Sequence, residues 1–262
     1  MKAYYINLDR RPDRVAHMAD QCSKLNLKIE RVSAVDCLDP VVVAEAALAP
    51  PNHWGRLMSV QTYACLQSHR KVWQQIVASG ASHGMVLEDD VLLAPDIGIY
   101  LQDEWVPADA DLVKLETKGW RVHLARAETP VPGGRHLRRM RSFHYGCGCY
   151  VVSAKAASRL LSETAVTGDA VDVILFSDDL PYFSDELPYF ATAMIYQMKP
   201  APATQGDLCI DKPSWSISDI AMPAESPSAK ARETLVQRAT RRLYNEIKAR
   251  IMGTSYICVA HG

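Results

Sequence analysis

The first 36 residues carry the pattern that most restricts the fold. Residues 3–8, AYYINL, are a short apolar run typical of a strand, and residues 29–36, IERVSAVD, alternate as a second strand. Pro12 between them fits the first turn of a helix. The apolar residues that follow recur at helical spacing: Val15, Met18, Cys22 and Leu25. A strand, a helix and a second strand in this order are the unit of a parallel α/β sheet.

The chain continues this alternation up to about residue 200. A long helix is predicted from Ser59, a residue type that caps helix starts, to Gly80, a residue type that ends them. The other expected elements are a short helix within residues 37–58, strands at 84–90, 111–117 and 144–153, a long hairpin at 119–143 and a helix at 154–163. We therefore predict a single α/β core sheet over this part of the chain.

The C-terminal part differs in composition. Residues 200–228 are rich in Pro, Ser and Asp and are predicted to be loop. From Pro227 to Met252 there are seven Lys or Arg and two Glu, a charge of +5, which leaves −6 on the rest of a chain of net charge −1. Aliphatic residues recur here every four positions: Leu235, Ala239, Leu243, Ile247 and Ile251. We predict a domain over residues 1–220, followed by a linker and a basic amphipathic helical extension over residues 221–262.

Composition excludes several classes of protein. Hydrophobic residues make up 48% and charged residues 23% of the chain, which is typical of a folded globular domain. No apolar run is long enough for a spanning helix, and the start lacks the apolar core of a secretory signal, so we expect a cytoplasmic protein. Seven scattered cysteines predict free thiols, and the spacing of Cys147 and Cys149 does not fit a zinc knuckle, so no structural zinc is expected.

Three consecutive carboxylates, Glu88, Asp89 and Asp90, end the apolar strand at residues 84–90. In open α/β sheets, ligands bind at the carboxyl ends of the strands. Because adjacent like charges disfavour joint ionisation, the cluster is either solvated, partly protonated or neutralised by a cation. Oxygen ligands suit Mg²⁺ or Mn²⁺, usually together with substrate phosphates. A metal site and a plain solvated turn are the two interpretations.

Common catalytic motifs are missing from the sequence. Neither GxGxxG nor GxxxxGK[ST] occurs, and neither do GxSxG, HExxH or CxxC. The remaining possibility is an enzyme that uses a metal ion, without a glycine-rich loop, to act on phosphate groups. A metal-dependent nucleotidyltransferase or phosphohydrolase fits this description, as does a transferase that uses a nucleotide-linked donor. A non-catalytic module is the alternative to these enzyme classes.

Several short motifs in a fixed order resemble glycosyltransferase family 25. They are INLDRRPDR, VSAVD, CLQSHRKVW, GMVLEDDV, DLVKLET, YGCGCYVVS with AASRLL, and AVDVILF, spread over roughly residues 1 to 220. The resemblance implies a GT-A fold, a Rossmann-like nucleotide-sugar domain with a mixed, mainly parallel sheet. It also implies an inverting, metal-assisted transfer of a hexose, expected to be galactose from UDP-galactose, to a saccharide of the lipopolysaccharide core.

The same resemblance assigns roles to the acidic cluster and to the first strand. Asp90 is expected to bind the Mn²⁺ or Mg²⁺ ion that bridges the donor diphosphate, with Glu88 as a further metal candidate. Glu88 or Asp89 is expected to hold ribose, metal-bound water or the sugar. Nucleotide contacts are expected from residues at the end of the first strand and just after it, where arginine suits phosphate: Asn7, Arg10 and Arg14.

Other site candidates come from later motifs. His69 and Arg70 belong to the SHR motif and are expected to line the site. Lys114 and Glu116 share one face of their strand, and we expect that face to point toward the donor. An inverting transferase needs a base near the acceptor hydroxyl; Asp172 is nominated, ahead of Asp169 or His144.

The expected partners follow from the resemblance and from the basic helix. They are a nucleotide sugar and a saccharide acceptor, expected to be lipid-linked; no nucleic-acid partner is expected. A basic face beside an aliphatic stripe suits an anionic membrane surface, so the helix is expected either to contact the inner face of the bacterial inner membrane or to pack on the enzyme's own core.

Overall fold

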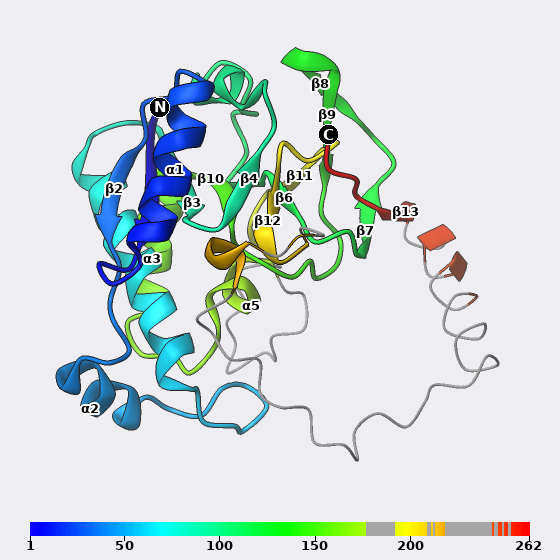
Figure 1. The fold of residues 1–262 in the computed structure, drawn as a ribbon. Helices are drawn as coiled ribbons and strands as arrows, with labels where there is room; N and C mark the ends of the chain where they lie inside the picture. Colours follow the sequence, from blue (N-terminus) through cyan, green and yellow to red (C-terminus); the bar gives the residue numbers. More distant parts are fainter. Residues whose placement is uncertain are drawn as a thin grey trace.

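The computed structural model describes residues 1–176, 192–208, 211, 213–217, 243, 246–247, 249–250 and 253–262. Over these residues the chain forms an α/β domain around one large sheet (Figure 1). The described α-helices are α1 (Pro12–Lys24), α2 (Pro40–Leu48), α3 (Val60–Ala78), α4 (Ala154–Glu163) and α5 (Val171–Phe176). The strand–helix–strand unit predicted at the start of the chain is confirmed.

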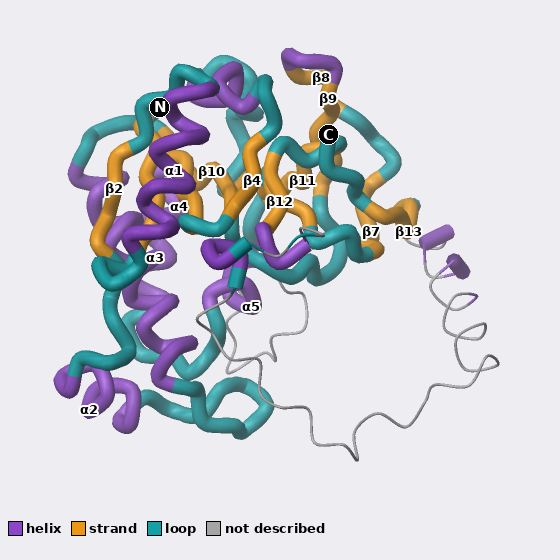
Figure 2. Tube along the Cα trace, in the orientation of Figure 1, coloured by secondary structure: helices purple, strands orange, loops and turns teal. Residues whose placement is uncertain are grey.

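The large sheet has eight described strands in the order β2, β1, β3, β10, β5, β11, β9, β8. Figure 2 draws the strands in orange and labels five of these: β2, β10, β11, β9 and β8. Their bounds are β1 (Lys2–Asn7), β2 (Glu30–Ser33), β3 (His83–Glu88), β5 (Leu112–Lys114), β8 (Thr129–Val131), β9 (Arg135–Arg139), β10 (Cys149–Ser153) and β11 (Ile195–Lys199). The sheet is mixed, as expected: β9 and β10 run opposite to the rest. Most strands of the large sheet therefore point the same way. Among neighbouring strands, however, only the pairs β1–β2, β1–β3 and β5–β11 are parallel, and the other pairs are antiparallel.

Two smaller sheets flank the large one. The first joins β4 (Val91–Leu93), β12 (Ala203–Gln205) and β6 (Glu116–Thr117), and the second joins β7 (Arg121–Ala125) to β13 (Thr254–Cys258). The strand predicted over residues 111–117 is therefore divided between two sheets. The division falls at Leu115, whose backbone N–H still bonds to Cys149 while its carbonyl accepts from Ala203 of β12.

Helices cover both faces of the large sheet. Alternate strand residues point to opposite faces, so one core cluster gathers Tyr4, Val86 and Tyr150 with side chains of α3, α4 and α5. The other cluster gathers strand residues of the opposite face, such as Met85, with Met18 of α1. Burial of apolar area on both faces contributes most of the stabilisation of this arrangement.

The start of α3 shows how local sequence sets an element. The Ser59 hydroxyl accepts a hydrogen bond from the Thr62 N–H at 3.1 Å, which satisfies one of the free donors of the first turn. This confirms the predicted cap. The helix places the SHR motif, with buried Ser68 and His69, against the sheet.

The predicted basic helix lies mostly outside the described residues. Those that are described, at 243, 246–247 and 249–250, are helical. After them β13 pairs antiparallel with β7, and Val259 is buried in the core cluster on the α3 face. The sequence analysis did not predict this strand.

Candidate active site

The acidic cluster lies where β3 ends. Glu88 is the last residue of the strand, and Asp89 and Asp90 form the turn into β4. Asn7 ends the parallel neighbour β1, so the two strand ends meet at the same edge of the sheet. The Asn7 side-chain amide donates to Asp89 Oδ2 at 2.6 Å. Asn7 and the acidic cluster are therefore in direct contact in the structure.

Arg14 of α1 supplies the positive charge of this cluster. Its Nη1 lies 2.5 Å from Asp89 Oδ1 and its Nη2 lies 3.1 Å from Asp90 Oδ2, and all three side chains are largely buried. One guanidinium therefore faces two carboxylates. Burial raises the pKa of Asp89, although Arg14 and Asn7 oppose the effect.

One carboxylate oxygen of Asp90, the buried Oδ1, has no hydrogen-bond partner among the described residues. Burial and the neighbouring charge of Glu88 raise the pKa of Asp90 to about 7. A buried, unsatisfied carboxylate oxygen beside further carboxylates is a donor set that fits a hard divalent cation such as Mn²⁺ or Mg²⁺.

Glu88 points to a different set of groups. Its Oε1 lies 3.2 Å from the Cys147 thiol and 3.5 Å from His69 Nε2, and its Oε2 accepts from the Gln205 amide at 2.8 Å. Burial opposes ionisation, but the contacts with His69 and Cys147 and the charge of Lys118 together outweigh it and lower the pKa of Glu88. Both oxygens of Glu88 are thus held by protein groups, whereas Asp90 presents an oxygen that is not.

A loop of small residues, Gly146 to Gly148, connects several predicted site residues. Lys114 Nζ donates to the Gly146 carbonyl and lies 3.2 Å from Glu116 Oε2. The Gly148 N–H donates to the same Glu116 oxygen at 2.8 Å. Lys114 and Glu116 were predicted to share the face of one strand; they lie in different strands, β5 and β6, but their side chains meet and both are completely buried.

The same loop reaches Asp172 and Glu88. The Gly146 N–H donates to Asp172 Oδ2 at 3.2 Å, and the Gly148 carbonyl accepts from the Glu88 N–H at 2.8 Å. Asp172 also accepts from the Val173 N–H at 2.9 Å at the start of α5. The structure therefore brings Glu88, Glu116 and Asp172 to one loop, although they are far apart in the sequence.

The alternatives to Asp172 have other partners. Asp169 Oδ1 lies 2.6 Å from His53 Nδ1. His144 Nδ1 lies 2.7 Å from Gln197 Oε1, and burial, with help from Lys114, lowers the pKa of His144 to about 3. An imidazole with so low a pKa is a weak proton acceptor.

Two predicted residues lie away from the acidic cluster. Arg10 pairs with Asp36 at 3.0 Å, and Arg70 Nη1 donates to the Leu161 carbonyl at 2.9 Å near the end of α4. Asp36 and Arg70 both line a cavity of about 580 Å³ between the ends of β1 and β2 and the helices α2 and α3. The three residues of the acidic cluster do not line this cavity.

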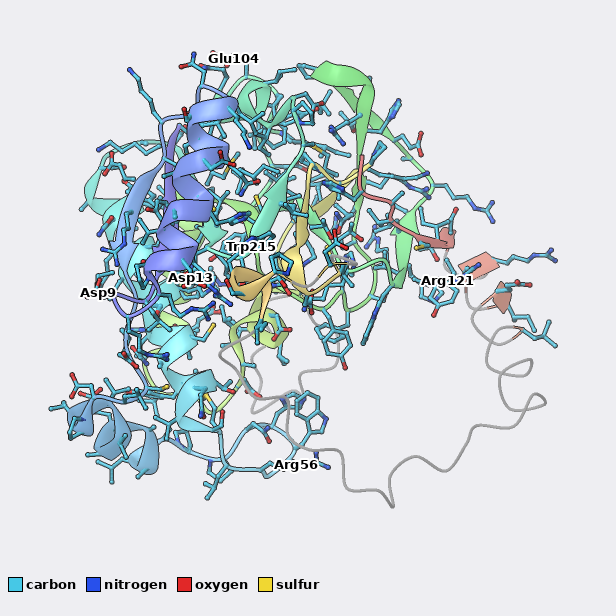
Figure 3. All side chains as sticks on the ribbon, in the orientation of Figure 1. Asp9, Asp13, Arg56, Glu104, Arg121 and Trp215 are labelled. Carbon is cyan, nitrogen blue, oxygen red and sulfur yellow. The ribbon has the colours of Figure 1, made fainter. Side chains whose placement is uncertain are left out.

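Sequence reasoning missed the segment that covers the acidic cluster. Trp215, which is labelled in Figure 3, belongs to this segment. Its ring stacks on that of His17 of α1, with ring centroids 3.6 Å apart. The Ile217 carbonyl accepts from Arg14 Nη2 at 2.8 Å, and Gln205 holds Glu88. Each of these residues is more than 100 positions from its partner and lies in a stretch predicted only as loop, so no local signal pointed to them.

Among the helices that the structure describes, none combines the length and the apolar character needed to cross a bilayer.

Comparison with known proteins identifies the family. The sequence profile described as Glycosyltransferase family 25 (LPS biosynthesis protein) matches residues 1–175. The lacto-N-neotetraose biosynthesis glycosyltransferase LgtB of Neisseria meningitidis serogroup B is 29% identical over 188 residues, 68% of each chain. LgtE of Neisseria gonorrhoeae is 28% identical over 220 residues, 78% of this chain and 74% of its own.

Among solved structures, a glycosyltransferase involved in the glycosylation of the major capsid of PBCV-1 matches at 11% identity with a TM-score of 0.32. The match covers 61% of this chain and 62% of the capsid glycosyltransferase, and the structural similarity is low. The family profile spans two thirds of the chain and includes the acidic cluster, Arg14 and the Gly146–Gly148 loop. The chain therefore belongs to glycosyltransferase family 25 and is a glycosyltransferase.

Proposed function

We propose that this enzyme is an inverting galactosyltransferase that transfers galactose from UDP-galactose to a saccharide acceptor of the lipopolysaccharide core. The family profile is described as an LPS biosynthesis protein, and the relatives LgtB and LgtE are named for lacto-N-neotetraose biosynthesis. The observation that carries the metal-assisted mechanism is the unsatisfied Oδ1 of Asp90 in the acidic turn after β3.

The fold is proposed to be of the GT-A type. Support comes from a mixed sheet with helices on both faces and from a carboxylate-rich turn at the carboxyl end of a central strand. Asp90 would hold Mn²⁺ or Mg²⁺. When bound, the ion supplies electrostatic stabilisation to the departing UDP diphosphate.

The residues around Asp90 have separate tasks in this proposal. Arg14 opposes the effect of burial on the pKa of Asp89 and Asp90, and Asn7 fixes the orientation of Asp89 through its 2.6 Å hydrogen bond. Arg10 lies next to the cavity residue Asp36 and is assigned to the nucleotide. His69 and Glu88 form the wall between the acidic turn and the Gly146–Gly148 loop.

Asp172 is proposed as the base. As the acceptor hydroxyl oxygen bonds to the anomeric carbon, the bond from that carbon to the UDP oxygen breaks, and the hydroxyl proton passes to the Asp172 carboxylate. Its two hydrogen bonds from backbone N–H groups hold the carboxylate in place. Lys114 and Glu116 position the loop that provides one of those donors.

The test is a steady-state assay with UDP-galactose and a saccharide acceptor, with and without Mn²⁺. We expect Asp90→Asn to lower kcat/KM by at least about 100-fold and to abolish the dependence on Mn²⁺. Asp20→Asn, which changes a carboxylate that pairs with Lys24 on the surface of α1, is the matched control and should stay within about twofold because exposed pairs contribute little.

Two outcomes would contradict the proposal. Unchanged Mn²⁺ dependence in Asp90→Asn would remove the metal role. Release of UDP at full rate without any acceptor would instead indicate a phosphohydrolase that uses the same carboxylates on phosphate directly.

We also propose that the basic C-terminal segment contacts the anionic membrane that displays a lipid-linked acceptor. The support is its charge of +5 beside an aliphatic stripe. The protein should sediment with vesicles that contain phosphatidylglycerol and not with vesicles of phosphatidylcholine alone. Equal sedimentation with both would contradict an electrostatic contact.

A further inference from the structure

Four metal-binding side chains converge beside the acidic turn. Cys65 and His69 lie one turn apart on α3, Glu88 ends β3, and Cys147 lies in the Gly146–Gly148 loop. One ligand atom from each of the four lies within 4.8 Å of all the others. His69 and Cys147 are buried, and Cys65 and Glu88 are partly buried.

The three distances among the His69, Glu88 and Cys147 ligand atoms are close to the edges of a tetrahedron, and the Cys65 thiol lies within 4.8 Å of these atoms. Zinc bonds of about 2.3 Å to sulfur and about 2.0–2.2 Å to nitrogen or oxygen give tetrahedral edges of roughly 3.3–3.8 Å. Cys147 Sγ lies 3.7 Å from His69 Nε2 and 3.2 Å from Glu88 Oε1, and those two atoms lie 3.5 Å apart. Small side-chain adjustments would therefore place all of them around one ion.

Hydrogen bonds from neighbouring side chains orient His69 and Glu88 toward the cluster. His69 Nδ1 lies 2.8 Å from the Tyr150 hydroxyl oxygen, which also accepts from Trp73 Nε1 at 2.8 Å. This contact turns Nε2 toward Cys147 and Glu88, as the outer hydrogen bond of a metal-binding histidine does. Gln205 holds the second oxygen of Glu88 and leaves the first facing the cluster.

We propose that Cys65, His69, Glu88 and Cys147 bind a structural zinc ion. Four protein ligands close the coordination shell, which is typical of structural rather than catalytic zinc. Two thiolates distinguish this site from the oxygen donors around Asp90, which suit Mn²⁺ or Mg²⁺. On binding, the two thiols release their protons to solvent and the zinc–sulfur bonds form.

The site would tie α3 and β3 to the loop that hydrogen-bonds Asp172 and Glu116. The sequence analysis expected no structural zinc because Cys147 and Cys149 have the wrong spacing for a knuckle. Cys149 belongs to β10 and packs in the core cluster on the opposite face, so the knuckle spacing is irrelevant to this cluster. The useful signal is the four-residue spacing of Cys65 and His69 on a helix, which places both on one face.

The zinc content of the full chain, purified without chelators, tests the inference. We expect about one zinc per chain by mass spectrometry of the elements. Replacement by Co²⁺ alone should give thiolate-to-cobalt charge-transfer absorption and the intense ligand-field bands of a tetrahedral site. Cys65→Ser and Cys147→Ser should each weaken zinc binding by at least about 100-fold. Cys37→Ser should retain zinc.

Measurements on the unchanged protein test the zinc site even if a variant folds poorly. Chelation should lower the Tm of the unchanged protein, and added zinc should restore it. No zinc, no cobalt spectrum and a Cys65–Cys147 disulfide in the unchanged protein would overturn the proposal. The inference does not depend on the proposed function, because Asp90→Asn should retain zinc whether or not it loses Mn²⁺-dependent transfer.

Discussion

The guanidinium of Arg14 lies 3.1 Å from the carboxylate of Asp90, and both side chains are largely buried. The same guanidinium also bonds to Asp89. Arg14→Met would leave two buried carboxylates without their cation, so we expect a loss of about 3–5 kcal/mol in the free energy of unfolding, measured in urea. Saturating Mn²⁺ should recover part of it.

Lys24→Met is the control for that experiment. Lys24 forms an exposed ion pair with Asp20 on the same helix, and its loss should cost at most about 0.5 kcal/mol. Equal losses for the two variants would mean that Arg14 does not balance the charge of the acidic turn.

Asp172→Asn should lower kcat by about 10²–10⁴-fold while the KM for the donor changes little, because an amide of the same shape cannot take the acceptor proton. The measurement is kcat, determined at saturating donor and acceptor. Asp169→Asn, next to His53, should keep most of its activity. Full activity in Asp172→Asn would assign the base to another residue.

Gly146→Ala should destabilise the protein and slow transfer. Gly146 has a φ of +87°, and an added Cβ would lie 2.5 Å from Glu116 Oε1. Gly134 has a φ of +73° with no atom within 4 Å of an added Cβ, so Gly134→Ala should lose only the backbone cost of about 1–2 kcal/mol. A loss in Gly146→Ala no larger than in Gly134→Ala, measured in urea, would contradict close packing of the loop.

The stability of the protein should fall as the pH falls below about 6.5 because of His144. Burial lowers the pKa of folded His144 to about 3, so between these pH values the unfolded chain binds a proton that the folded protein does not. The free energy of unfolding should therefore drop by up to about 1.4 kcal/mol per pH unit from this residue.

Urea unfolding from pH 7.5 to 4.5 measures this slope. His144→Gln should flatten it relative to the unchanged protein, whereas His136→Gln on β9 should not. An unchanged slope in His144→Gln would assign the acid sensitivity to other groups.

The order of elements could be read from the sequence because each signal was local. The run before the acidic cluster, the Ser59 cap and the helical spacing after Pro12 each depend on residues a few positions apart. The position of the acidic cluster at a strand end also followed from the sequence, whereas the hydrogen bond from Asn7 to Asp89 was not predicted.

The rest of the site depends on contacts between distant residues. Nothing near Glu88 in the sequence indicates that Gln205 holds it, or that Cys147 and His69 face it. Leu115 looks like the middle of one strand, but its carbonyl is taken by Ala203 and the strand changes sheets there. Such pairings are decided by tertiary hydrogen bonds that no short window of sequence contains.

The reversed direction of β10 has a consequence for how this enzyme can change. Because β10 runs against β3 and β5, its entry rather than its exit lies at the edge that carries Glu88 and Lys114. The connection that leads into β10 therefore forms a wall of the site without belonging to the strands that hold the carboxylates. Changes in the length of this connection before Gly146 would therefore reshape that wall while β3 and β5 keep their register.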